Sequence, residues 1–129
     1  MEKWEVLDSN EVIKNKWLTI KNQTFKTGNG KIIKNYFIVE KKDYVILIIE
    51  DNEEVFFAEQ YRPGIGDVII KLPMGIINDG ETKEETAKRE MLEETGYESN
   101  SLEFLGIFYL APSYISTTAH VFYTSKIIK

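Results

Sequence analysis

The chain has 129 residues, of which 43% are hydrophobic, enough to bury the core of one domain. It contains no cysteine, which excludes disulfide bonds and thiolate metal sites. Its 16 basic and 21 acidic residues give a net charge of −5, which argues against a nucleic-acid partner.

The sequence has no apolar run long enough to span a membrane and no charged-then-apolar leader. We therefore expect a cytoplasmic protein without a membrane partner. We find no repeat, linker or low-complexity segment, so we expect a single domain over residues 1–129.

The N-terminal part of the chain is typical of strands. Residues 2–7 predict a short strand, and residues 17–40 predict two strands around the turn Gly28-Asn29-Gly30, whose residues tolerate positive φ. Residues 44–50, with the sequence YVILIIE, form a continuous apolar run. Such a run predicts a strand that is buried on both faces.

Four further strands are predicted around one helical segment. Residues 55–61 and 68–72 are separated by the loop 62–66, which is rich in proline and glycine. Residues 102–110 and 119–125 follow the helix. Many strands around one helix indicate an α+β fold of the α/β/α sandwich type, a mixed sheet with helical cover.

The helical segment lies within residues 75–97, GIINDGETKEETAKREMLEETGY. Thr82 and Glu85 form a predicted capping box that begins a helix at Lys83, and Gly96 provides the left-handed residue that ends it. Helical spacing places Ala87, Met91, Leu92 and Thr95 on one face, which we expect to be buried.

Three glutamates share a different face of this helix. Glu90, Glu93 and Glu94 are related by three- and four-residue spacings, which bring their carboxylates close together near the end of the helix. The helix dipole disfavours anions there. Hard divalent cations with oxygen ligands are the natural compensation, so the pattern predicts a Mg²⁺ (or Mn²⁺) site that Arg89 helps to orient.

These residues resemble the box of the Nudix hydrolases, which reads Gly, five residues, Glu, seven residues, Arg-Glu-U-x-Glu-Glu-x-Gly-U, where U is a bulky aliphatic residue. Met91 and Tyr97 stand at the U positions, and Tyr97 departs mildly from the pattern. The fixed positions are all filled, by Gly75, Glu81, Arg89, Glu90, Glu93, Glu94 and Gly96.

The resemblance implies a hydrolase that cleaves a pyrophosphate bond in a small nucleoside diphosphate derivative. It implies that the glutamates of the helix hold the metal ions. We expect Glu90 and Glu94 to bind metal and Glu93 to bind metal or accept the proton of the attacking water, with Glu90 as the alternative base. The carbonyl of Met74 would be a further metal ligand. Glu81 would pair with the arginine of the box.

Residues outside the box resemble the ADP-ribose pyrophosphatase subfamily. Residues 59–62 (EQYR), residues 72–75 (LPMG) and Pro112 carry this likeness. We expect Arg62 to bind a substrate phosphate, with a surface salt bridge as the alternative. The subfamily has a glutamate in the loop after the proline, where this chain has Thr117, a candidate for contact with substrate; Lys71 also replaces a glutamate.

The expected substrate is therefore ADP-ribose or a nucleotide-sugar. Two alternatives stay open: a noncatalytic sensor of nucleotide-sugars with the same fold, and a pyrophosphatase for nucleoside triphosphates. The family usually has a C-terminal helix, which we expect to be absent here. We also expect a homodimer formed through the strands of residues 1–40, as the subfamily resemblance implies.

Overall fold

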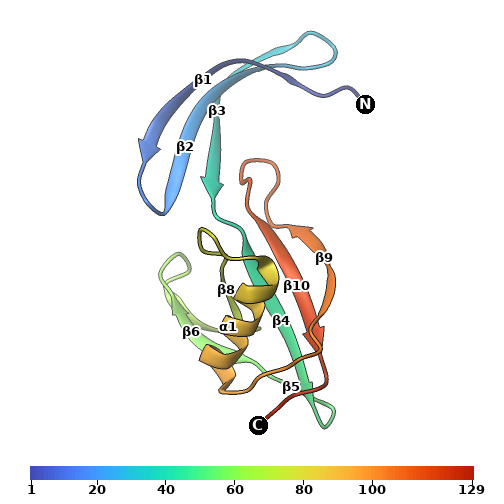
Figure 1. Ribbon diagram of the computed structural model, residues 1–129. Helices are drawn as coiled ribbons and strands as arrows, with labels where there is room; N and C mark the ends of the chain where they lie inside the picture. The colour runs from blue at the N-terminus through green and yellow to red at the C-terminus, as the bar shows by residue number, and fades with distance from the viewer. The chain divides into compact units, whose positions relative to one another are not determined.

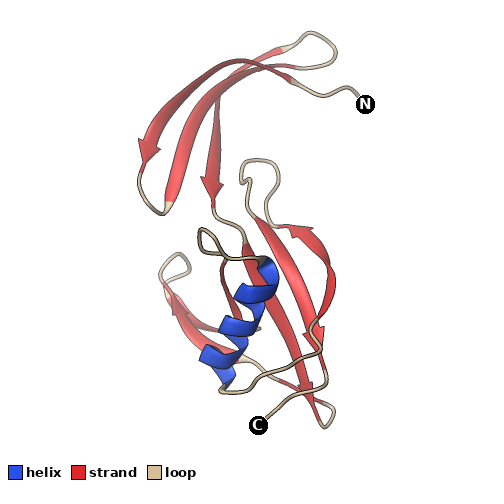
Figure 2. Cartoon of the chain, in the orientation of Figure 1, coloured by secondary structure: helices blue, strands red, loops and turns tan.

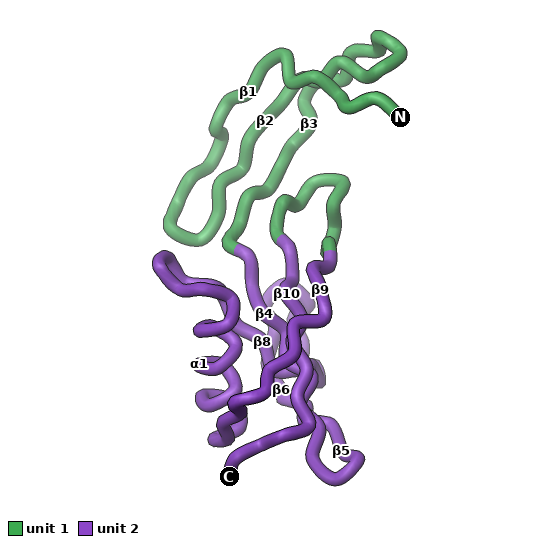
Figure 3. The backbone as a smooth tube through the Cα atoms, turned by 45° about the vertical axis from the view of Figure 1, so that its right-hand side comes forward, with its two compact units in different colours: residues 1–42, 109–117 green, residues 43–108, 118–129 purple.

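The computed structural model describes all residues from Met1 to Lys129 (Figure 1). The chain divides into two compact units, which are described separately (Figure 3). Unit 1 comprises residues 1–42 and 109–117, and unit 2 comprises residues 43–108 and 118–129. A single domain over residues 1–129 stays a prediction.

The chain forms one helix and ten strands. Figure 2 colours the helix blue and the strands red. Their bounds are β1 Glu5–Lys14, β2 Leu18–Lys26, β3 Ile32–Lys41, β4 Tyr44–Asp51, β5 Glu54–Val55, β6 Ala58–Arg62, β7 Asp67–Lys71, β8 Met74–Ile76, α1 Lys83–Thr95, β9 Glu103–Tyr109 and β10 Thr118–Thr124.

Unit 1 is built on an antiparallel sheet with the strand order β1-β2-β3. The predicted turn between β2 and β3 is confirmed, because the Gly30 amide donates to the Thr27 carbonyl at 2.8 Å and Gly30 has a φ of 85°. The rings of Trp4, Phe25 and Tyr36 pack edge to face. All ten residues of β1 are exposed, and this strand extends well beyond the predicted residues 2–7.

Unit 2 contains a mixed sheet with the order β5-β4-β10-β9, in which β8 also pairs with β4. β10 runs parallel to β4, whereas β5 and β8 run antiparallel to it. The helix α1 contacts β4 and β8. This arrangement confirms the α+β class and the mixed sheet with a single helix.

The core of unit 2 lies between α1 and the sheet. Its buried residues are Val45, Leu47, Ile49, Ala87, Met91 and Phe122. In β4 these buried residues alternate with half-buried ones, so the expected burial on both faces is wrong. The reason is that α1, the only helix, covers one face of the strand.

Two features of unit 2 were not predicted from the sequence. The predicted strand 55–61 is divided into β5 and β6, since Phe56 turns inward and packs edge to face against Tyr97, with 5.6 Å between the ring centroids. The strand β8 lies within a segment that reads as loop, and it pairs with the first residues of β4.

No helix of the chain has the length and apolarity needed to cross a membrane. A cytoplasmic location stays a prediction.

Candidate active site

The ends of α1 agree with the prediction. The Thr82 hydroxyl accepts from the Glu85 amide at 3.1 Å, and the Glu85 carboxylate accepts from the Thr82 amide at 2.9 Å. Gly96 ends the helix with a φ of 75°, and its amide donates to the Leu92 carbonyl at 2.8 Å. These caps satisfy backbone groups that a helix end leaves unpaired.

The buried face of α1 differs in part from the prediction. Ala87 and Met91 are fully buried as expected, but Leu92 is 47% exposed. Thr86 and Glu90 are buried in its place, so the buried stripe follows positions 86, 87, 90 and 91. The helix is therefore rotated such that one glutamate of the acidic face, Glu90, points into the protein.

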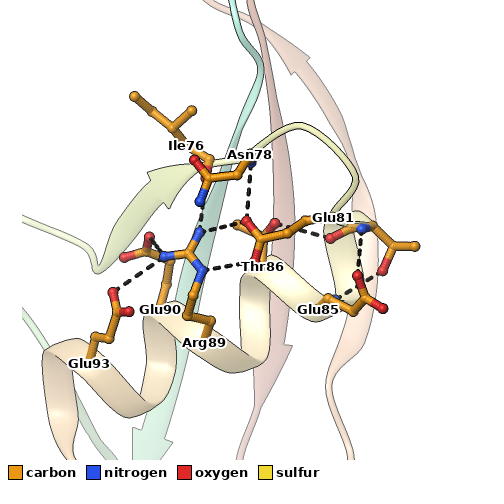
Figure 4. Close-up of polar contacts among 9 residues, drawn as sticks. Ile76, Asn78, Glu81, Glu85, Thr86, Arg89, Glu90 and Glu93 are labelled. Carbon is orange, nitrogen blue, oxygen red and sulfur yellow. Dashed lines mark hydrogen bonds and ion pairs between the residues drawn. The ribbon is translucent and has the colours of Figure 1, made fainter.

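Arg89, in the middle of α1, and Glu81, just before the helix, form a two-point ion pair (Figure 4). The Arg89 Nε donates to Glu81 Oε2 at 2.9 Å, and Nη2 donates to Glu81 Oε1 at 3.0 Å. The Asn78 amide also donates to Glu81, at 3.1 Å. The hydrogen bonds from Arg89 lower the pKa of Glu81 from 4.5 to about 2. The pair of Glu81 with the arginine of the box is thus present.

The same guanidinium also reaches the acidic face of α1 (Figure 4). Its Nη1 lies 2.5 Å from Glu90 Oε1 and 3.3 Å from Glu93 Oε2. Its Nη2 donates to the Ile76 carbonyl of β8 at 3.1 Å. Arg89 therefore contacts three carboxylates and ties the helix to β8. A contact with acidic side chains was predicted from its place in the sequence, whereas the contact with β8 was not.

Glu90 is the buried member of the acidic face, with 11% of its side chain exposed. Its carboxylate lies against Gly75 of β8, where an added Cβ would overlap it. Burial raises the pKa of Glu90, Arg89 opposes this shift, and the charges of Glu93 and Glu94 raise it further. Gly75 is therefore required to leave room for a buried carboxylate beside other negative charges.

The other two glutamates are held more loosely. The Glu93 side chain is 57% exposed and has the single long contact to Arg89. The Glu94 side chain is 23% exposed, and its Oε1 lies 3.4 Å from the ammonium of Lys71, whose side chain is 6% exposed. We predicted no contact of this lysine with the helix, although an isolated cation in the apolar run VIIKLP indicates a charge that needs a partner.

The donors of the acidic face suit a hard divalent cation, because carboxylate oxygens are the ligands that Mg²⁺ prefers. No group of three or more acidic or histidine side chains is gathered closely enough to hold a metal ion in the conformation described. Each carboxylate instead contacts a cation of the protein, either Arg89 or Lys71. The donor chemistry thus fits a metal ion, and binding requires the looser side chains to reorient.

The remaining predicted site residues lie in different parts of the chain. Arg62 ends β6, and its Nη2 donates to the sulfur of Met74 at 3.4 Å, which places it beside the start of β8. Thr117 belongs to unit 1, where its hydroxyl is buried and donates to the Lys41 carbonyl at 3.3 Å. Contact of Arg62 or Thr117 with a substrate stays a prediction.

Comparisons with known proteins identify the family of this chain. The family profile described as NUDIX domain matches residues 40–126. The ADP-ribose pyrophosphatase of Bacillus subtilis (strain 168) is 30% identical over 99 residues, which cover 77% of this chain and 54% of that protein. The methanol dehydrogenase activator of Bacillus methanolicus is 29% identical over 101 residues, which cover 78% of this chain and 55% of that protein.

A solved structure has the same fold. The crystal structure of an ADP compounds hydrolase aligns with a TM-score of 0.83 and 22% identity, covering 99% of this chain and 70% of that chain. A mixed sheet whose single helix carries the acidic box defines a Nudix-type protein. The chain belongs to the NUDIX domain family. It spans about half the length of the curated relatives named above.

Proposed function

We propose that the protein is a metal-dependent hydrolase that cleaves the pyrophosphate bond of a nucleoside diphosphate derivative, with ADP-ribose or a nucleotide-sugar as substrate. The observation that carries the proposal is the acidic face of α1, where the buried Glu90 lies beside Gly75 and close to two more carboxylates. The name of the Bacillus subtilis relative supports the choice of substrate.

Glu90 and Glu94 would hold the metal ions together with the carbonyl of Met74. A bound Mg²⁺ or Mn²⁺ would activate water and neutralise the charge that grows on the phosphate oxygens. Arg89 holds Glu90 and Glu93 in place through its Nη1. Arg62 would bind a phosphate of the substrate, since a guanidinium can donate two parallel hydrogen bonds to it.

Glu93 is our candidate for the general base, because its side chain is 57% exposed and open to water. Glu90 is the alternative base, since it is the other carboxylate of the acidic face that the Arg89 Nη1 contacts. Thr117 is proposed only as a contact for the substrate, because a threonine hydroxyl is not basic enough to replace a carboxylate.

The test is product analysis with the full chain and Mg²⁺ or Mn²⁺. ADP-ribose, an ADP-sugar and a nucleoside triphosphate are incubated separately, and the products are separated by chromatography. We expect AMP and a sugar phosphate from ADP-ribose, and no reaction in the presence of a chelator. Faster turnover of the triphosphate than of ADP-ribose and the ADP-sugar would show that our proposed substrate class is wrong. No turnover of any of the three would contradict the proposal of a hydrolase.

A second candidate is a sensor that binds a nucleotide-sugar without cleaving it. The observation that favours it is the pairing of the acidic side chains with Arg89 and Lys71, which leaves no group of three free to hold a metal ion. Binding of ADP-ribose in calorimetry without formation of AMP in the same sample would identify the sensor.

We also propose a homodimer formed through residues 1–40. The support is β1, whose ten residues are all exposed and include the large apolar side chains of Val6, Leu7, Val12 and Ile13. Exposed apolar surface of this kind is typical of an interface. Light scattering should give twice the chain mass of 15.0 kDa. Val12→Asp should reduce the measured mass, and Asn10→Asp is the control. A monomer at micromolar concentration would exclude the dimer.

A further inference from the structure

Lys71 is a buried cation at the end of β7. Only 6% of its side chain is exposed, and its place in the strand is fixed by pairing with Ala58 of β6. Burying an ammonium group costs free energy unless an anion or hydrogen-bond acceptors compensate it. The lysine therefore needs a partner within the protein.

That partner is Glu94, in the last turn of α1. The Lys71 Nζ lies 3.4 Å from Glu94 Oε1 and 3.4 Å from the carbonyl of Leu72. Both distances exceed the usual length of about 2.7–3.2 Å for a hydrogen bond from nitrogen to oxygen. The ammonium thus neutralises Glu94 without locking its carboxylate in one orientation.

The charges around the acidic face show what this lysine does. The two cations Arg89 and Lys71 contact four carboxylates there, those of Glu81, Glu90, Glu93 and Glu94. The two-point pair of Arg89 is directed at Glu81. The net charge of −2 that remains is the charge that one divalent cation neutralises, and removal of Lys71 would leave −3.

We propose that Lys71 is a resident cation of the metal site, which neutralises Glu94 in the metal-free protein and weakens the binding of divalent cations to that carboxylate. The inference rests on the proposed metal-dependent function. Lys71 is a positioning residue, because it acts on Glu94 and not on a substrate. A divalent cation that uses Glu94 must displace the ammonium or share the carboxylate with it.

The test is titration of the full chain with Mn²⁺, in which electron paramagnetic resonance measures the free ion. Lys71→Met removes the charge and keeps an unbranched side chain of similar length. We expect its Kd for Mn²⁺ to fall about tenfold, which corresponds to about 1.4 kcal/mol. Lys71→Arg keeps the charge and should behave as the wild type. Lys88→Met, which removes an exposed charge from α1, the helix that carries Glu94, is the control.

Calorimetric melting gives a second measurement. Without metal, Lys71→Met should melt below the wild type because Glu94 loses its partner, and Mn²⁺ should raise its melting temperature more than that of the wild type. Adding Glu94→Gln to Lys71→Met should remove the extra Mn²⁺ effect. A lysine with a merely structural role would lower the melting temperature and leave the Kd for Mn²⁺ unchanged.

The outcomes separate the two proposals. If the wild type binds Mn²⁺ and Lys71→Met binds it with the same Kd, the role of Lys71 is wrong and the hydrolase stands. The same holds if Lys71→Arg binds as tightly as Lys71→Met, because charge is then not the cause. If Lys71→Met binds Mn²⁺ more tightly than the wild type but no substrate is cleaved, the hydrolase fails and the role of Lys71 stands. If no variant binds Mn²⁺, both are wrong.

Discussion

The two ends of α1 carry the same acidic side chain in opposite surroundings. At the start of the helix, Glu85 closes the capping box and Glu81 accepts two hydrogen bonds from Arg89. At the end, Glu93 and Glu94 each have one contact, at 3.3 and 3.4 Å. The helix dipole favours anions at the start and disfavours them at the end. The first carboxylates hold the structure, whereas each of the last two is held by one long contact with a cation of the protein.

Glu94→Gln should have the largest effect, because it removes a carboxylate from the end of the helix. We expect metal-dependent hydrolysis to fall by at least about 100-fold, since the water then loses its metal activation. Steady-state rates on ADP-ribose measure this, and calorimetry should show an intact fold. The control is Glu84→Gln in the first turn, where the ion pair with Lys83 is 4.0 Å long. Equal turnover by Glu94→Gln and Glu84→Gln would show that the carboxylates at the two ends of α1 do not differ in function.

Gly75→Ala should have the next largest effect. The added Cβ overlaps the Glu90 carboxylate, and overpacking of a core typically costs about 1–3 kcal/mol. Urea denaturation measures this loss, and the affinity for Mn²⁺ should fall with it. Gly64→Ala is the control, since a Cβ there meets no atom within 4 Å. An unchanged midpoint for Gly75→Ala would mean that Glu90 does not occupy the position described.

Thr82→Ala tests the capping box at the start of the helix. Loss of the cap should lower the free energy of unfolding by about 1 kcal/mol, measured in urea, with little change in the rate of hydrolysis. Thr82→Ser keeps the hydroxyl that accepts from the Glu85 amide, so it should retain most of the stability. A large loss of hydrolysis in Thr82→Ala would show that this end of α1 does more than hold the structure.

Glu81→Gln should have the smallest effect, a loss of thermal stability whose size depends on pH. The folded pKa of about 2 lies below the ordinary 4.5, so ionised Glu81 stabilises the fold above pH 4.5 and this contribution is lost as the pH falls towards 2. The melting temperature of Glu81→Gln should lie below that of the wild type at neutral pH, and the gap should close on acidification. A gap that stays constant would contradict the ion pair with Arg89.

The helix and its charges were largely predictable because their signals are local. Thr82, Glu85 and Gly96 define the ends of α1 by short-range rules, and the structure confirms all three roles. The pair of Glu81 with Arg89 followed from the family resemblance and is also present. Residues three or four positions apart on a helix lie close together, so these contacts can be predicted from their spacing in the sequence.

The errors concern packing between distant segments. The exposure of Leu92 depends on how α1 rotates over β4 and β8, which helical spacing alone does not fix. The pairing of Lys71 with Glu94 joins residues 23 positions apart, so no local rule reveals it. The strand β8 forms only because β4 offers it a partner. Tertiary contacts decide each of these features.

The positions of the two tryptophans give the protein separate optical signals for its two units. Trp4 and Trp17 both belong to unit 1, where Trp4 packs on Phe25 at 5.8 Å and Trp17 lies beneath the Lys16 ammonium at 4.7 Å. Indole fluorescence therefore reports on the antiparallel sheet. The only helix belongs to unit 2, so the helical band in far-ultraviolet circular dichroism reports on the acidic box. Recording both signals during one thermal unfolding experiment would show whether unit 1 and unit 2 unfold at the same temperature.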